Sequence, residues 1–547
     1  MSLQTQPIFD IPELTAEIAR SAFPKGNIYM QMRDELGVFY DNEQFTALFS
    51  HTGQPAIAPW RLALVTVMQF AENLTDRQTA NAVRARIDWK YVLSLEMQDA
   101  GFDYSVLSEF RGRLIVGGQE ELLLQAMLDC FQEKKLLKQR GKQRADSTHI
   151  LATVRHLNQL ELVHETLRHA LNELALQAPA WLKRQVNADW FDLYSQRTSN
   201  YLLPKKEEER QTWAERVGQD GLFLMEQVYF GVYRAELSEL PAVETLRQVW
   251  LQNFCQDNGQ VRLRQQKDQP PSAQRITSPY ELEARCSTKR ETTWTGYKVH
   301  LTETCDADSP NLIVNVETRT STEPDHTVTG IIHDHLAQKA CLPAEHFVDQ
   351  GYTSVDNLVR ANKEHAVDLM GAVPDDNSWQ ALHQGYDSRH FTINWDKEQA
   401  VCPQNHTSCS WSLAKTRSQR PVVKIKFCRK DCGACDQIAL CTNNKEKRRT
   451  LTVLAPRGHF EAQQDARQRQ QTTEFKEACH LRAGVEGTVS QTAYALGARQ
   501  ARYRGIAKTH LQNLATAAAA NLLRVIAWLN EVPRSVTPQS HFARLAA

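Results

Sequence analysis

The stretch Ala145-Asp146-Ser147-Thr148-His149-Ile150-Leu151-Ala152-Thr153-Val154 decides the fold class, because the pattern of the chain changes there. It is prone to β-structure and contains neither proline nor glycine, so we predict a strand. Before it, residues 59–72 carry apolar side chains at helical spacing, and Thr75 offers a cap to a following helix. The change from helices to a strand favours an α/β protein whose N-terminal region, residues 1–140, is helical.

Helical and strand patterns alternate after this stretch. Apolar residues recur every three or four positions from 157 to 174, and residues 156 to about 265 favour helices. Strand patterns return at residues 297–301, 312–316, 345–349 and 368–373, with helix patterns at 327–340 and 355–365. This alternation favours a mixed α/β sheet. Further helices are predicted at residues 462–481, as one long polar helix, and at 508–529.

The composition is that of a globular protein. The chain has 547 residues, of which 41% are apolar and 23% charged, which argues against a disordered, collagen-like or small disulfide-bonded protein. The first residues show no basic region followed by an apolar core, so we expect no secretory signal. Asn521 and Arg524 interrupt the apolar residues 514–529, which are too few to span a membrane. We therefore expect a cytoplasmic protein.

The charges are balanced in number but not in position. Lys and Arg total 64, as do Asp and Glu, yet residues 134–144, 415–430 and 497–510 hold six, seven and four basic residues and no acid. Such local basic stretches suit a phosphate-bearing partner. Each stretch taken alone is more typical of a solvated loop.

Six of the twelve cysteines lie between residues 402 and 441. Cys432-Gly-Ala-Cys435 is a C-x-x-C pair, whose two thiolates can bind one metal ion across a tight turn. Cys441 and Cys402 could complete a tetrahedral zinc site. The competing ligands are Cys428, Cys409 and His406, and a set of reduced thiols without metal is the alternative.

Three acids stand at the ends of predicted elements. Asp146 lies in the first strand, Asp349 ends a later strand, and Glu486 follows the long polar helix. Carboxylates in such places can hold Mg²⁺, which prefers oxygen ligands. Two ions about 4 Å apart stabilise the attacking and leaving oxygens of a phosphoryl transfer. Any one of these acids taken alone is more typical of a cap, a turn or a surface ion pair.

Three segments, in this order, resemble the DDE transposases of bacterial insertion sequences: Arg144-Ala-Asp146-Ser-Thr, Asp349-Gln-Gly351-Tyr352 and Arg482-Ala-Gly-Val-Glu486-Gly-Thr-Val-Ser490. They are most similar to the branch related to the IS-four/IS-five superfamily. Residues 294–303 and 497–510 support this resemblance, and residues 23–114 look like the N-terminal domain of that branch. The resemblance covers nearly the whole chain.

The resemblance implies an RNase H-like mixed-sheet catalytic domain at residues 141–547, following a helical domain for DNA binding or dimerisation at residues 1–140. It implies a helical insertion at 156–270 and a Cys-rich insertion at 376–455. Asp146, Asp349 and Glu486 are then the catalytic ligands of two Mg²⁺ ions. The implied ligands of a structural zinc are Cys402, Cys432, Cys435 and Cys441.

The implied function is metal-dependent DNA cleavage and strand transfer of an insertion sequence. The partners are then double-stranded DNA, as terminal inverted repeats and target, and a second copy of the chain, in association with a bacterial nucleoid. Many relatives have Tyr and Lys where this chain has Cys479 and Ala493. The candidates for phosphate contacts are Arg482, Arg499, Arg502, Arg504 and Lys508. The alternatives are an RNase H-like nuclease that does not move DNA and a transposase-derived regulator that binds DNA without cutting it.

Overall fold

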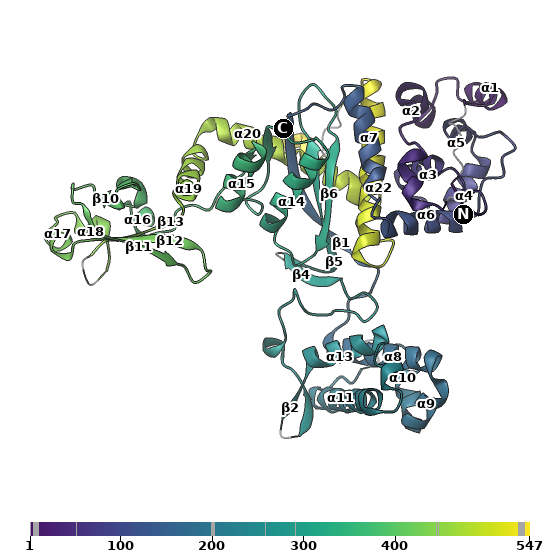
Figure 1. Ribbon diagram of the computed structural model, residues 1–547, viewed down its shortest axis with the longest axis horizontal. Helices are drawn as coiled ribbons and strands as arrows, with labels where there is room; N and C mark the ends of the chain where they lie inside the picture. Colours follow the sequence, from purple (N-terminus) through teal and green to yellow (C-terminus); the bar gives the residue numbers. More distant parts are fainter. Residues whose placement is uncertain are drawn as a thin grey trace.

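A mixed β-sheet lies at the centre of the computed structural model, with helical groups and a smaller sheet around it (Figure 1). The structure describes residues 2–3, 10–50, 52–198, 203–257, 259–289, 291–444, 446, 448–533 and 542–546. The strands of the central sheet are β1 (Lys142–Leu151), β4 (Arg285–Lys289), β5 (Thr292–Thr304), β6 (Ile313–Thr320), β7 (Glu345–Phe347) and β8 (Asp368–Met370).

The directions of these strands define the fold. β5 pairs antiparallel with β1, β4 and β6, whereas β1, β7 and β8 pair parallel to one another. The parallel strands are connected through α14 (Asp325–Gln338), which precedes β7, and α15 (Val355–His365), which precedes β8. The prediction of an α/β fold with an RNase H-like mixed sheet is confirmed.

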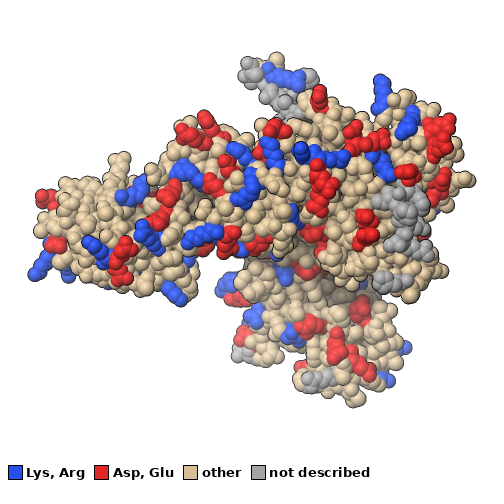
Figure 2. Space-filling model, turned by 45° about the horizontal axis from the view of Figure 1, so that its top comes forward, with Lys and Arg blue, Asp and Glu red and all other residues tan. Residues whose placement is uncertain are grey.

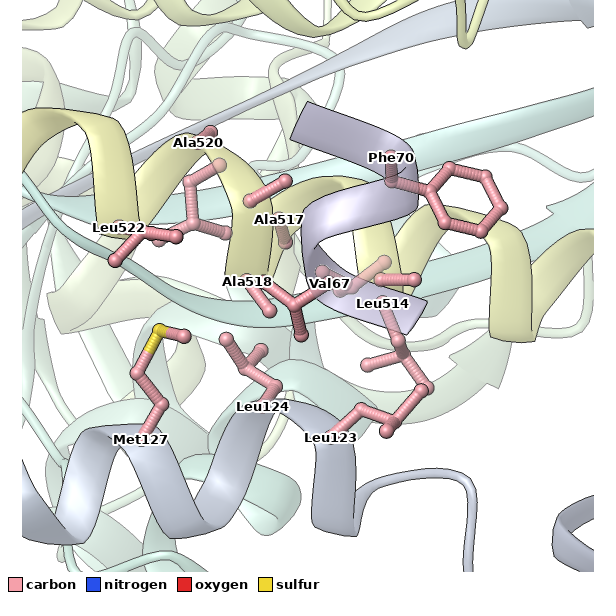
Figure 3. Close-up of a cluster of buried hydrophobic side chains, with 14 of the residues drawn as sticks. Val67, Phe70, Leu123, Leu124, Met127, Leu514, Ala517, Ala518, Ala520 and Leu522 are labelled. Carbon is pink, nitrogen blue, oxygen red and sulfur yellow. The ribbon is translucent and has the colours of Figure 1, made fainter. Parts of the chain in front are cut away.

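The N-terminal helices share one hydrophobic core with the sheet. They pack with α22 (Ile506–Leu529), which also packs against β6. In Figure 3, Val67 of α3 and Leu124 of α7 lie close to Ala518 of α22. The small side chains of residues 517–520 are completely buried, which lets the three helices approach closely. The N-terminal helices are α1 (Glu13–Ala22), α2 (Ile28–Leu36), η1 (Glu43–Leu48), α3 (Pro59–Ala71), α4 (Asp76–Ala85), α5 (Ile87–Val92), α6 (Ser105–Val116) and α7 (Leu122–Glu133).

Replacing Ala518 by leucine is expected to destabilise the protein by about 1–3 kcal/mol, because the added atoms overpack a completely buried site between closely packed helices. Urea unfolding followed by tryptophan fluorescence measures the change. Ala507→Leu is the matched control, since Ala507 lies exposed in the first turn of the same helix. Equal midpoints for the two variants would contradict the packing described here.

The segment between β1 and β4 forms a separate body below the sheet in Figure 1, with its own apolar core. Most of it is helical, as predicted for residues 156–270, but it also contains a β-hairpin that the periodicity did not indicate. Its elements are α8 (Gln159–Gln177), α9 (Pro179–Gln185), α10 (Ala188–Tyr194), α11 (Glu207–Phe230), α12 (Arg234–Leu237), α13 (Pro241–Asn253), the hairpin strands β2 (Phe254–Asp257) and β3 (Gln260–Leu263), and η2 (Gln266–Asp268).

The Cys-rich segment forms a body at the far left of Figure 1, away from the central sheet. Three of its strands form an antiparallel sheet in the order β11-β12-β13, and the other two form a small hairpin. Its elements are α16 (Trp379–Leu382), η3 (Ser388–His390), β9 (Thr392–Asn394), β10 (Gln399–Val401), β11 (Ser408–Lys415), β12 (Pro421–Phe427), α17 (Arg429–Gly433), α18 (Ile438–Cys441) and β13 (Thr450–Leu454).

The long polar helix predicted at residues 462–481 is wrong, because the structure has two helices there. α19 (Arg457–Arg469) ends before Thr472, whose side chain accepts a hydrogen bond from the Phe475 N–H and so caps α20 (Thr473–Ala483). The chain continues through α21 (Val485–Ser490) and a π-helical turn, η4 (Gln491–Ala495), toward α22; a short helix, η5 (Ala543–Ala546), lies near the C-terminus.

The surface carries both signs of charge. Lysine, arginine, aspartate and glutamate side chains are interspersed over the face that Figure 2 shows. Because the two signs are mixed, the net charge says little about partners, and individual unpaired charges are more informative.

Among the described residues, no helix combines the length and apolar character needed to cross a bilayer.

Candidate active site

Asp146 lies on β1, and Asp349 lies just after the end of the neighbouring parallel strand β7. Arg144 of β1 is opposite Phe347 of β7 in the register of the pair. Two residues further along each strand direction are Asp146, still in β1, and Asp349, just after the end of β7. Parallel strands keep such positions side by side. The structure therefore brings together two of the three acids that the sequence analysis selected.

The surroundings of Asp146, including Asp349, disfavour its ionised form. Burial raises the pKa of Asp146, and the charge of Asp349 raises it further. Opposing this, Asp146 accepts hydrogen bonds from the Ser147 N–H (2.7 Å) and from Nη1 of Arg482 (3.0 Å). Asp349 accepts one from the Gly351 N–H (2.8 Å). A divalent cation between the two carboxylates would relieve their repulsion, so this donor set fits Mg²⁺.

Glu486 is on α21, and its side chain is exposed. Arg482, which contacts Asp146, precedes it by four residues but is on α20, and Gly484 separates the two helices. Within the described part of the chain, however, the oxygens of Asp146, Asp349 and Glu486 do not all lie within 4.8 Å of one another. Glu486 is thus on a helix that packs against β1, but its carboxylate does not form one cluster with those of the two aspartates in this structure.

A buried ionic network holds α21 against the sheet. Glu303 of β5 is fully buried and accepts hydrogen bonds from Arg144 Nε (2.7 Å), Arg524 Nη1 (2.7 Å) and the Thr488 hydroxyl. Arg144 also donates to the backbone carbonyl of Leu481 (2.7 Å). The network therefore fixes the helical residues on both sides of Glu486. Sequence patterns do not reveal this role, because burial of these charges depends on partners far away in the chain.

Three of the five candidate phosphate-binding residues are engaged inside the protein. Arg482 pairs with Asp146. Arg499 donates to the Thr148 hydroxyl (3.0 Å) and the His149 carbonyl (2.8 Å), and thereby ties the chain after η4 to β1.

Arg502 joins the C-terminal segment to the N-terminal helices. It donates to the Leu74 carbonyl (2.8 Å) and to the Asn73 side chain, and lies 4.4 Å from the ring centre of Phe70. Arg504 and Lys508 are exposed, and neither side chain has a hydrogen bond or ion pair to any described residue. Arg504 and Lys508 are therefore the two candidates whose side chains make no polar contact with the described protein.

The four cysteines selected as zinc ligands line one small cavity. Cys402, Cys432, Cys435 and Cys441 lie on its wall with His406, whereas Cys409 and Cys428 do not. All twelve cysteines of the chain are free thiols. Burial raises the pKa of Cys441 to about 11, and the neighbouring cysteines add to this rise. No three of the four sulfur atoms are within 4.8 Å of one another. The donor set is one that Zn²⁺ prefers, so it fits the metal in chemistry.

Another cluster of potential ligands lies on α14 and α15. Among the described residues, Asp334, Glu364 and His365 form the one group of three whose ligand atoms lie within 4.8 Å of one another. The guanidinium of Arg360 donates to both oxygens of Asp334 (2.8 Å each) and to Glu364 (2.7 Å). Since Arg360 pairs with both acids, the cluster is an ion-pair network between two helices.

A buried histidine beside the site makes stability depend on pH. His300 of β5 is 1% exposed, its Nδ1 lies 2.7 Å from the Tyr352 hydroxyl, and burial lowers its pKa from 6.5 to about 4. The unfolded chain thus binds more protons between pH 6.5 and 4. The stabilisation is fully present above pH 6.5 and is lost as the pH falls toward 4, at a cost of about 3 kcal/mol.

We expect His300→Gln to be less stable than wild type at pH 7, and this difference to shrink by about 2–3 kcal/mol at pH 4.5. Urea unfolding at the two pH values measures it. His480→Gln, at an exposed position on α20, serves as the control. A difference between wild type and His300→Gln that does not change with pH would contradict the burial of a neutral imidazole.

The sheet with two adjacent aspartates defines an α/β protein with a candidate centre for divalent cations. Two comparisons with protein families agree with this class. Residues 401–526 match the transposase DDE domain, and residues 18–113 match a transposase domain designated DUF772. The chain therefore contains two segments of transposase type. The first match includes Glu486 but neither aspartate, and neither match distinguishes a branch of insertion sequences. No curated protein and no solved structure matches the chain significantly.

Proposed function

We propose that this chain is a transposase that cuts the ends of an insertion sequence and joins them to target DNA. The observation that carries the proposal is the pair Asp146, on β1, and Asp349, just after the parallel strand β7, in a chain whose C-terminal part matches the transposase DDE domain. Glu486 is the third carboxylate, supplied from α21. The IS-four/IS-five branch, with its helical N-terminal domain and Cys-bearing insertion, is part of the proposal.

Asp146, Asp349 and Glu486 would hold two Mg²⁺ ions. Such ions, when bound, lower the pKa of a coordinated water and stabilise the charge of the attacking and leaving oxygens. The Ser147 N–H and Arg482 favour the ionised form of Asp146, the form that binds a cation. Because burial raises the pKa of Asp146, protons compete with the cation more strongly than at an exposed aspartate.

The DNA contacts are assigned to the remaining basic and helical parts. Arg504 and Lys508 are exposed before and within the first turn of α22, and we assign them to the phosphates near the cut. Arg482 lies beside Asp146 and can reach a phosphate bound there. The helices of residues 1–140 would bind the terminal inverted repeats and pair two copies of the chain, because two ends must be brought together.

The test uses a DNA fragment that carries the inverted repeats bordering the gene, a supercoiled target plasmid and Mg²⁺. The proposal predicts cuts at the repeat boundaries and joining of the freed 3′ ends to the plasmid. Cutting without joining would favour a nuclease of the same fold. Specific binding without cutting, with Mg²⁺ present, would favour a transposase-derived regulator.

A structural zinc in the Cys-rich body is a second part of the proposal. We expect about one zinc per chain by metal analysis of the purified protein, and its loss in the variant Cys432→Ser/Cys435→Ser. Because this pair lies on the wall of the cysteine cavity, its loss leaves too few thiolates for a closed site. Cys428→Ser is the matched control, since Cys428 is not on that wall. Zinc retained by the double variant, or lost from Cys428→Ser, would refute this ligand set.

A further inference from the structure

In the three-stranded sheet of the Cys-rich body, one face packs on the apolar core of this body, and much of the other is open to solvent. Val423, Ile425, Leu451 and Val453 are buried in the apolar core of this body. Side chains alternate along a strand, so the intervening residues are on the opposite face. Around Lys424 and Lys426, that opposite face carries charged and hydroxyl side chains.

The register of the sheet arranges these side chains in two rows. Ser412 of β11, Lys424 of β12 and Thr452 of β13 are directly opposite one another. The neighbouring row consists of Ser410, Lys426 and Thr450. The residues of the first row are exposed and those of the second are half-buried. Each lysine thus stands between two hydroxyl groups, and we call this surface the lysine–hydroxyl face.

The lysines of this face have no acid to neutralise them. Residues 415–430 contain seven basic residues and no acid. All of these residues are described by the structure, and none of the seven basic side chains makes an ion pair or a side-chain hydrogen bond. Elsewhere in the chain, cations such as Arg360 and Arg469 are bound to carboxylates. The face is therefore a local positive surface on a chain whose net charge is zero.

Its chemistry fits a phosphate backbone better than a base or an apolar surface. Lysine ammonium groups and serine and threonine hydroxyls are the side chains that donate to phosphate oxygens in DNA complexes. The aromatic residue of β11, Trp411, belongs to the opposite face, where its ring centre is 5.3 Å from that of Trp395. The lysine–hydroxyl face thus offers no ring for stacking, which single-stranded nucleic acid would use.

We propose that the lysine–hydroxyl face binds the phosphate backbone of double-stranded DNA without regard to sequence. The inference rests on the proposed transposase function, because it takes DNA as the partner of the chain. It adds a contact on a body distant from the central sheet in Figure 1, separate from Arg504 and Lys508. The Cys-rich body then contributes to holding DNA as well as to folding around its cysteines.

The test compares the full-length variant Lys424→Gln/Lys426→Gln with wild type on a random-sequence duplex, by fluorescence anisotropy at several salt concentrations. Each lost phosphate contact should reduce the slope of log affinity against log salt by about 1, so the double variant should lose about 2. The loss should be the same on duplexes of different sequence. Lys183→Gln/Arg184→Gln, two exposed cations on α9 without ion pairs among the described residues, is the matched control.

Lys424→Arg/Lys426→Arg keeps both charges and should bind as wild type does, which separates charge from folding; circular dichroism checks each variant. An unchanged slope in the glutamine variant, or no binding of wild type to the duplex, would overturn the inference. Polyglutamate serves as a probe for an acidic protein partner. If the glutamine variant loses binding to polyglutamate but still binds DNA as wild type does, the inference is overturned as well, because the face would then bind an acidic protein. Cleavage is measured separately. If the glutamine variant shows the reduced slope but wild type cuts no DNA, the role of this face in DNA binding is supported, and only the catalytic proposal is contradicted.

Discussion

Asp349→Asn lowers the rate of end cleavage by about 10³-fold or more at saturating Mg²⁺. The substitution removes the charge that we propose holds the cation, while the amide oxygen can still accept the hydrogen bond from the Gly351 N–H. A loss of about 4 kcal/mol of transition-state stabilisation corresponds to this factor. Asp146→Asn should have a similar effect, since the two carboxylates lie side by side. Single-turnover cleavage of the repeat-bearing fragment measures both.

Asp356→Asn is the control for this comparison. Asp356 is on α15, is 68% exposed and pairs with His459 at 3.2 Å, so its loss removes a surface acid of the same domain. The double variant of Asp146 and Asp349 should be no slower than either single variant, because the residues of a catalytic unit are not additive. Cleavage by Asp349→Asn within tenfold of wild type would remove this residue from the proposed site.

Glu303→Ala destabilises the protein by about 3–5 kcal/mol. The substitution leaves the guanidinium groups of Arg144 and Arg524 in a buried place without their shared carboxylate. Removing one partner of a buried ionic network costs this much, because the remaining charge is uncompensated. The same variant should also cut more slowly, because the network holds α21, which carries Glu486. Urea unfolding gives the first quantity, and the cleavage rate the second.

Glu345→Ala is the matched control, since Glu345 of β7 is 37% exposed and pairs with Lys142 at 3.0 Å. A surface ion pair of this kind contributes about 0–1 kcal/mol. Equal stability losses in Glu303→Ala and Glu345→Ala would contradict the buried network.

Much of the fold could be predicted because the local patterns agree with the tertiary structure. The periodicity before and after Asp146 indicated the helical region, the strands and the mixed sheet. The break between α19 and α20 was missed because the polar periodicity continues across it. Thr472 caps the start of α20 by accepting a hydrogen bond from the Phe475 N–H, and the ring of Phe475 is buried beside Phe347. A new helix therefore begins there instead of a continuation of α19. The hairpin of β2 and β3 was missed in a segment whose helical pattern dominates.

The site was less predictable, because it depends on partners distant in sequence. The acids Asp146 and Asp349 were selected from their strand-like contexts, and parallel pairing brings them together. The contacts of the arginines, in contrast, could not be predicted from their local context. Arg502 looks like a free cation in the sequence, yet it donates to the carbonyl of Leu74, 428 residues earlier. Glu303 would be read as an ordinary strand acid, although it is completely buried between two arginines.

The central claim is that Asp146 and Asp349 hold divalent cations. Titration with Mn²⁺, followed by electron paramagnetic resonance in the presence of end DNA, tests it most directly because it does not require turnover. We expect wild type and Asp356→Asn to bind two ions per chain, and Asp146→Asn and Asp349→Asn to lose at least one of them. The same number of bound ions and the same affinity in wild type and both variants would contradict the claim.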